Sequence, residues 1–199
     1  MNQCDTCHRE LGFGAIISVT GRGTYCYTCY NAWLAAESGV RFDNAELEPV
    51  TLRDAIGRPH TFKIHSRLAL GVGHVMEATE ESAETLGYQF KVMGPEESDA
   101  MILFGELYAK MRRGLDIQYL RETRHGLQLV ERHFLAGRIE MDSGSDGPLL
   151  VVDGRPRSWD EIGRLLLSYE GWNVCFEVTD SIEGATQDPM PTDSSNARH

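Results

Sequence analysis

Apolar and polar residues alternate along several stretches of the chain, and a period of two is typical of a half-buried β-strand. In residues 60–68, Phe62 and Leu68 take even positions while the odd positions carry polar side chains. Residues 74–79 follow the turn Gly71-Val72-Gly73 and can return as the hairpin partner. The pattern therefore predicts an antiparallel pair of strands in this part of the chain.

Further strands are predicted on both sides of this hairpin. Each is a short run of alternating or wholly apolar residues that ends near glycine, proline or another turn-forming residue. The run before Asp153-Gly154 is wholly apolar, and this dipeptide is typical of a tight hairpin turn. The predicted strands are residues 88–92, 127–129, 135–141, 149–152 and 172–179, and residues 52–59 are predicted to be a strand that runs into a turn.

Two segments instead repeat apolar residues every three or four positions, as amphipathic helices do. We expect Ser98 to be the N-cap of the first helix. The second begins at Ser158-Trp159-Asp160-Glu161, a capping box, and is expected to end at Gly171. The positions predicted to face the core are Met101, Phe104, Tyr108, Met111 and Leu115 in the first helix, and Trp159, Ile162, Leu166 and Tyr169 in the second.

The order of these elements predicts the fold class. Strands occur in groups separated by two main helices, and strict β-α-β alternation is absent. Such an order is typical of α+β proteins, in which helices cover one face of a mostly antiparallel sheet. We therefore predict an α+β fold for the larger part of the chain.

The N-terminus carries a different pattern, made of two Cys-x-x-Cys pairs. The pairs are Cys4 with Cys7 and Cys26 with Cys29, separated by eighteen residues. Between them, residues 12–25 contain β-branched residues and Gly-Arg-Gly, which predict a short hairpin. Residues 27–37 favour a helix that Gly39 can end.

The cysteine spacing is typical of a closed tetrahedral zinc site. The same cysteines also fit two other patterns. The string Cys4-Asp5-Thr6-Cys7-His8 matches the attachment motif of c-type haem, but only three residues precede it, and an exported apoprotein needs a signal peptide. Two disulfides require an oxidising compartment, for which the sequence offers no sign. Zinc is the preferred interpretation, with one structural Zn²⁺ expected per chain.

Residues 4–38 resemble a treble-clef finger, the arrangement shared by GATA-type and LIM-type zinc fingers. The resemblance rests on the cysteine spacing and on the order of a knuckle, a hairpin and a second knuckle at a helix N-terminus. It implies that Cys4, Cys7, Cys26 and Cys29 are the metal ligands. A site closed by four thiolates has no open position for water, so the metal is expected to be structural.

Charge argues against nucleic acid as the partner of this finger. Residues 1–41 hold three basic and three acidic residues, and the whole chain has a formal net charge of −11. Phosphate binding depends on lysine and arginine, which the finger does not have in excess. We therefore expect protein partners, and nucleic-acid binding through the finger is kept as an alternative.

The predicted organisation is a zinc finger at 1–40, a linker at 41–49, an α+β domain at 50–182 and a disordered tail at 183–199. The α+β domain is expected to fold without the finger. It resembles a family of uncharacterised bacterial proteins, on the basis of Pro59-His60-Thr61-Phe62, His125-Gly126-Leu127-Gln128-Leu129 and the segment from Asp153 to Trp172. No apolar stretch is long enough to span a membrane, so a cytoplasmic, membrane-free protein is expected.

Catalytic candidates are weaker. His60, His65 and His74 lie on one predicted hairpin, but residues five apart on a strand face opposite sides, and a solvated polar face is preferred to a second metal site. Cys175 is interpreted as an inert thiol. An enzyme remains an alternative, with a cleft lined by His60, His74, His125 or Glu177. The preferred function is a protein-interaction or regulatory module of unknown specific role.

Overall fold

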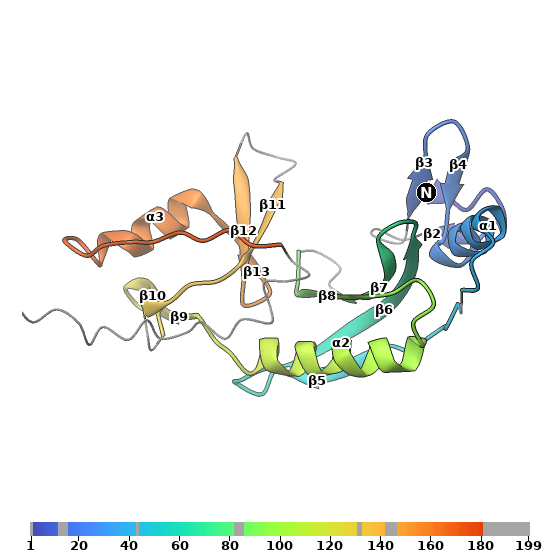
Figure 1. Ribbon diagram of the computed structural model, residues 1–199. Coiled ribbons are helices and arrows are strands. Elements are labelled where there is room, and N and C mark those ends of the chain that lie inside the picture. Colours follow the sequence, from blue (N-terminus) through green and yellow to red (C-terminus); the bar gives the residue numbers. More distant parts are fainter. Residues whose placement is uncertain are drawn as a thin grey trace, which may run out of the picture.

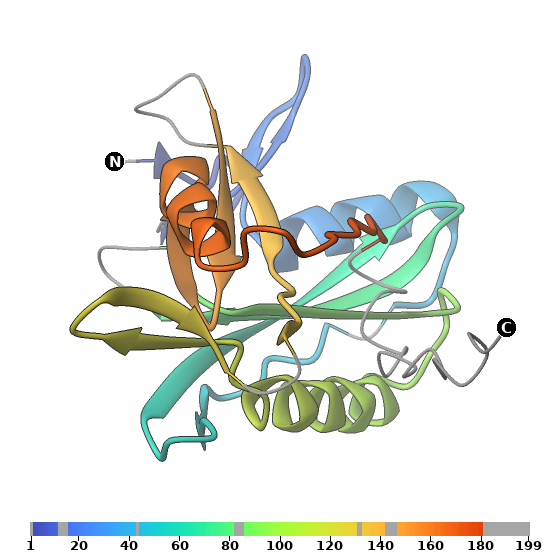
Figure 2. The same ribbon diagram turned by 90° about the vertical axis from the view of Figure 1, so that its left-hand side faces the viewer.

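The computed structural model describes residues 2–11, 16–42, 44–81, 86–130, 133–141 and 147–180, and it shows the predicted α+β architecture (Figure 1). The N-terminal cysteine segment lies at one end of the molecule. A sheet and a long helix form the middle, and a group of strands with a short helix forms the other end (Figures 1 and 2). None of the described helices is long and apolar enough to cross a membrane.

The central sheet contains four antiparallel strands in the order β5-β6-β7-β8. The strands are β5 (Val50–Arg53), β6 (Pro59–Ala69), β7 (Gly73–Glu80) and β8 (Gln89–Gly94). The predicted hairpin is confirmed, because residues 62–69 of β6 pair with residues 73–80 of β7.

Helix α2 (Ala100–Leu115) covers this sheet and completes the main hydrophobic core (Figure 1). The buried residues of this core come from the sheet and from one face of the helix. They are Leu52, Phe62, Met76, Ala78, Ala100, Leu103, Leu107, Met111 and Leu115.

Two details predicted for α2 are wrong. The N-cap is Asp99, whose Oδ1 accepts hydrogen bonds from the N–H groups of Met101 and Ile102, and not Ser98. Met101 is 59% exposed and Tyr108 is 38% exposed, because the buried stripe runs through Leu103 and Leu107 instead. The helix carries apolar residues on more than one face, so spacing alone did not identify the face that meets the sheet.

The C-terminal part builds a second, smaller core. It consists of the hairpin β9 (Leu120–Thr123) and β10 (Gly126–Leu129), the antiparallel strands β11 (Arg138–Met141), β12 (Pro148–Val152) and β13 (Arg155–Ser158), and helix α3 (Trp159–Leu167). Leu120, Val152 and Leu165 are buried at its centre.

The predicted turn and cap of this part are both confirmed. Asp153 and Gly154 have positive φ angles of 50° and 69° in the tight turn between β12 and β13. Ser158 and Glu161 form the reciprocal capping box of α3. The helix ends at Leu167, before Gly171, and Leu165 rather than Trp159 is buried, so the predicted apolar face is only partly right.

The strand predicted at 172–179 is wrong. Residues 172–180 pair with no strand among the described residues, although their apolar side chains alternate as predicted. Trp172, Val174, Phe176 and Val178 are all more than 60% exposed. Alternation supplies one face for burial, but a strand also needs a neighbouring edge to bond with. The predicted disordered tail lies outside the described residues.

The N-terminal segment contains two small hairpins and one helix. Strands β1 (Asn2–Gln3) and β2 (Glu10–Leu11) pair, as do β3 (Ile17–Val19) and β4 (Gly23–Tyr25). Helix α1 (Tyr27–Ser38) follows and ends at Gly39, whose φ of 70° confirms the predicted left-handed cap.

Helix α1 packs against β6, on the side of the β6–β7 hairpin opposite to α2 (Figure 2). The contact centres on Asn31, which is 1% exposed. Its Nδ2 donates to the carbonyl of Ser66 (2.7 Å), and its Oδ1 accepts from the N–H of Leu68 (2.9 Å). The pairing of β5 with β6 stops at Phe62, so β5 does not bond to the later residues of β6. The side-chain amide of Asn31 bonds to backbone groups there, as a neighbouring strand would.

Candidate metal centre

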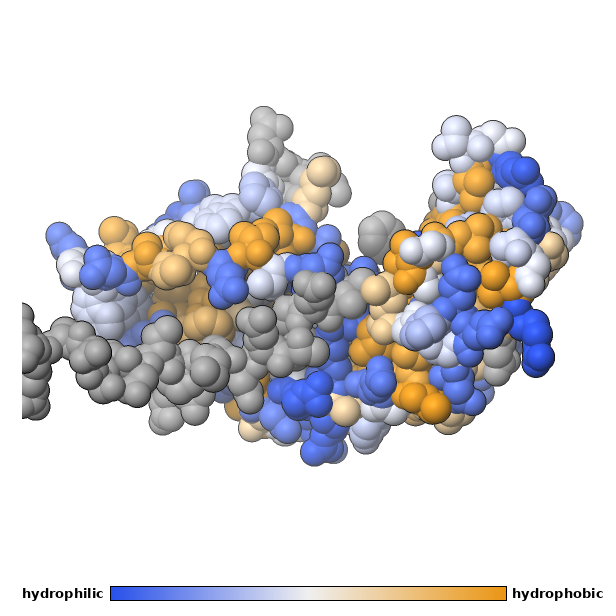
Figure 3. Space-filling view, in the orientation of Figure 1, coloured by the Kyte–Doolittle hydropathy of each residue, from blue (hydrophilic) through white to orange (hydrophobic). Residues whose placement is uncertain are grey.

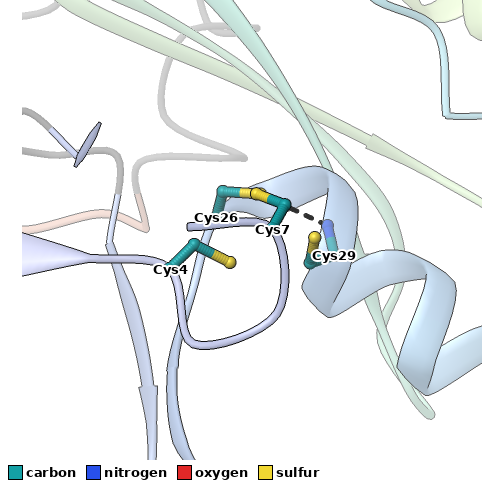
Figure 4. A group of neighbouring side chains, drawn as sticks. All are labelled: Cys4, Cys7, Cys26 and Cys29. Carbon is teal, nitrogen blue, oxygen red and sulfur yellow. Dashed lines mark hydrogen bonds between the residues drawn. The ribbon is translucent and has the colours of Figure 1, made fainter. Parts of the chain in front are cut away.

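The four predicted cysteines converge on one point (Figure 4). All four Sγ atoms lie within 4.8 Å of one another, and those of Cys7 and Cys26 are 3.8 Å apart. A tetrahedral zinc site with Zn–S bonds of about 2.3 Å has sulfur–sulfur edges of about 3.8 Å. The two Cys-x-x-Cys pairs therefore form one site of a size that can hold a metal ion.

Two different local structures present the sulfurs. The Cys4–Cys7 turn is closed by the N–H of His8, which donates to the carbonyl of Cys4 (2.9 Å), and by the N–H of Cys4, which donates to the carbonyl of Arg9 (3.0 Å). Cys26 is the N-cap of α1, and its Sγ accepts from the N–H of Cys29 (3.4 Å; Figure 4). The helix N-terminus thus supplies a donor to a sulfur.

Contacts around the cysteines hold the two knuckles together. The N–H of Asp5 donates to the carbonyl of Thr24 (2.8 Å), and the N–H of Thr24 donates to Oδ2 of Asp5 (2.7 Å). Gly23 has a φ of 119°, and a Cβ atom there would lie 2.3 Å from Oδ2 of Asp5. The close approach of the hairpin to the first knuckle therefore requires glycine at position 23.

The electrostatics of the cluster favour a bound cation. Burial raises the pKa of the Cys29 thiol, and the other cysteine sulfurs raise it further. Burial also raises the pKa of Cys26, although hydrogen bonds from Cys29 oppose this. Burial opposes ionisation of Cys4 as well, but backbone N–H groups outweigh it and lower its pKa to about 6. Four thiolates at this spacing repel one another, and a divalent cation removes that penalty.

The arrangement favours a shared metal site over the disulfide and haem interpretations of these cysteines. No disulfide joins the cysteines that the structure describes. The c-type haem motif uses the first pair alone, whereas here both pairs share one site. Cys175 is exposed in the extended segment and has no place in the cluster.

The three hairpin histidines do not form a solvated polar face, and that prediction is wrong. His74 is fully buried, with Nδ1 3.2 Å from the carbonyl of Ser98 and Nε2 2.6 Å from Oγ of Ser66. A carbonyl only accepts, so Nδ1 carries the proton and Nε2 accepts from the serine hydroxyl. His65 stacks on Tyr27 with ring centroids 4.8 Å apart.

His60 is held between two carboxylates. Its Nδ1 lies 2.6 Å from Oε1 of Glu80, and its Nε2 lies 3.2 Å from Oδ2 of Asp54. The catalytic candidates do not converge: His74 is buried elsewhere, His125 lies in the β9–β10 turn, and Glu177 lies in the exposed segment. Within the described ranges, only the cysteine cluster has three or more side chains at metal-ligand spacing.

Sequence reasoning missed Asn31, the residue that connects the cysteine module to the sheet. Its partners Ser66 and Leu68 are 35 and 37 positions away, so no local pattern indicates them. The sequence offers one weak signal: Asn31 is a polar residue in a predicted helix that also carries the apolar residues Trp33 and Leu34.

Comparison with known proteins adds two family matches. Residues 43–116 match a family described as a domain of unknown function (DUF7686), and residues 119–183 match a second domain of unknown function (DUF7713). Neither match includes the four cysteines. No curated protein and no solved structure matches the chain. The chain thus joins a four-cysteine module that can hold a metal ion to segments similar to two families without an assigned function.

Proposed function

We propose that residues 4–38 form a treble-clef finger holding one structural Zn²⁺ through Cys4, Cys7, Cys26 and Cys29. The observation that carries this proposal is the convergence of the four sulfurs within 4.8 Å. Thiolates are the ligands that zinc prefers over harder oxygen donors. Four of them leave no coordination position for water or substrate, so the ion stabilises the fold and performs no chemistry.

The proposed role of the whole protein is interaction with, or regulation of, another protein. Exposed hydrophobic side chains support this role, because large apolar residues at a surface often mark contact sites. The extended segment 172–180 exposes Val174, Phe176 and Val178 on alternate positions, as strands that join a partner's sheet do. Figure 3 shows hydrophobic surface along the course that this segment follows in Figure 1.

Electrostatics favour a protein over a nucleic acid as the partner. Arg22, one of three basic residues in 1–41, lies 4.9 Å above the Trp33 ring and 3.6 Å from Glu37. One of the three basic residues of the finger is therefore already paired. Because the chain as a whole carries −11, approach to phosphates is opposed.

The test is a fluorescence polarisation titration of the zinc-loaded chain against duplex DNA, RNA and single strands at about 150 mM salt. We expect weak binding without sequence preference. Submicromolar affinity for any of these nucleic acids would contradict the protein-interaction role and favour nucleic-acid binding through the finger. The variant Phe176→Asp serves as a control, because it should leave the weak nucleic-acid binding unchanged.

A further inference from the structure

A second candidate site lies where the central sheet meets the C-terminal strands. A cleft of about 220 Å³ opens there, lined by residues of the β5–β6 turn, by Tyr88, and by residues of β9, β12 and β13. The two segments that match different families both contribute to its walls. Small-molecule sites are found preferentially at such junctions.

Charged residues of both signs line this cleft. The carboxylates are Asp54, Glu122 and Asp153, and the guanidinium groups belong to Arg58, Arg121, Arg155 and Arg157. A concentration of arginine is unexpected in a chain with a net charge of −11.

Glu122 forms ion pairs with two of the arginines. Its Oε1 lies 3.1 Å from Nη1 of Arg155 and 3.0 Å from Nη2 of Arg157. Arg157 also lies 3.4 Å from Glu161. The Nε of Arg157 is nevertheless buried without a hydrogen-bond partner among the described residues. These two arginines are therefore already paired with glutamates of the chain.

The two aspartates accept hydrogen bonds from backbone N–H groups of the chain. Asp54 accepts hydrogen bonds from the N–H groups of Ile56 (3.0 Å) and Arg58 (2.8 Å) and contacts His60. Asp153 accepts from the N–H of Tyr119 (3.1 Å) and the N–H of Leu120 (2.8 Å). Each aspartate thus fixes a backbone turn, and neither forms an ion pair with a lining arginine.

Arg58 and Arg121 are the lining arginines that Glu122 does not contact. Both are exposed, and neither forms an ion pair within the part of the chain that the structure describes. Two large apolar side chains share the lining with them: Ile56 is 51% exposed and Ile117 is 41% exposed. The cleft therefore offers two guanidinium groups without an ion pair among the described residues, beside an apolar surface.

We propose that this cleft binds a small organic anion, with a phosphate or carboxylate on Arg58 and Arg121 and an apolar portion on Ile56 and Ile117. Guanidinium groups match the planar, paired acceptors of both anions. The apolar portion adds affinity by covering isoleucine surface that water otherwise contacts. The proposal is independent of the zinc site and of the proposed interaction role.

Calorimetric titration of the full zinc-loaded chain at about 150 mM salt tests the proposal with four probes. They are phenyl phosphate, benzoate, inorganic phosphate and benzyl alcohol. Phenyl phosphate or benzoate should bind saturably, at least about tenfold more tightly than inorganic phosphate or benzyl alcohol. The tighter of the two identifies the head group. Absence of saturable binding by both up to about 10 mM overturns the proposal.

Variants locate the binding. The double variant Arg58→Gln with Arg121→Gln should weaken the better probe at least about tenfold, because it removes both charged donors. The double variant Arg112→Gln with Arg113→Gln is the matched control, since both residues lie exposed on α2 and neither lines the cleft. Equal losses in the two double variants would show general electrostatic attraction and would overturn the site.

Discussion

At the scale of single residues, Asn31 makes buried hydrogen bonds whose loss should lower stability measurably. In Asn31→Ala, the buried carbonyl of Ser66 and the buried N–H of Leu68 lose their partners. We expect the free energy of unfolding to fall by about 2–4 kcal/mol, since each unsatisfied buried group costs about 1–3 kcal/mol. Urea denaturation followed by circular dichroism measures the change.

The matched control for this variant is Asn173→Ala, because Asn173 is exposed in the extended segment. It should change the unfolding free energy by less than about 0.5 kcal/mol. If Asn31→Ala were as mild as the control, α1 would contribute nothing to the stability of the sheet.

At the scale of secondary structure, the N-cap of α2 offers a direct test of where the helix begins. Asp99→Ala removes the acceptor for the N–H groups of Met101 and Ile102 and should cost about 1 kcal/mol. Ser98→Ala should cost clearly less, because the Ser98 side chain does not cap the helix. Thermal denaturation of both variants decides the matter, and the reverse order of effects would make Ser98 the cap.

Elements whose signals are local could be predicted, and elements that depend on distant neighbours could not. The capping box at Ser158, the Asp153-Gly154 turn and the β6–β7 hairpin are each specified within a few residues of sequence, and the structure has them all. The cysteine cluster also follows from two short knuckles. By contrast, the buried face of α2 depends on how the helix packs on the sheet, and segment 172–180 lacks a strand to pair with among the described residues. Neither fact can be inferred from neighbouring residues in the sequence.

At the scale of the whole molecule, the cysteine module contacts the sheet, but none of its described residues is among the buried residues of the main core. The nine buried residues of the main core all lie between Leu52 and Leu115. A chain that starts at Asn44 should therefore still unfold cooperatively. Its midpoint should be lower than that of the full chain, because the edge of β6 loses Asn31 and His65 loses its stacking on Tyr27.

Calorimetry of this shortened chain provides the measurement. A broad transition without a cooperative peak would mean that the module is a required part of the main fold. An unchanged midpoint would instead mean that the contacts of α1 with β6 contribute no stability. The core composition and the Asn31 contacts together predict the intermediate result.

The central claim is that four thiolates hold one structural zinc ion, and metal stoichiometry by native mass spectrometry tests it most directly. The purified chain should carry one zinc per molecule. Cys26→Ser should lose the ion and unfold the finger at residues 4–38, because metal binding supplies most of the folding free energy of such modules. Cys175→Ser, the matched control outside the cluster, should keep both the ion and the fold. A chain that carries no zinc, or zinc that survives in Cys26→Ser, would contradict the account.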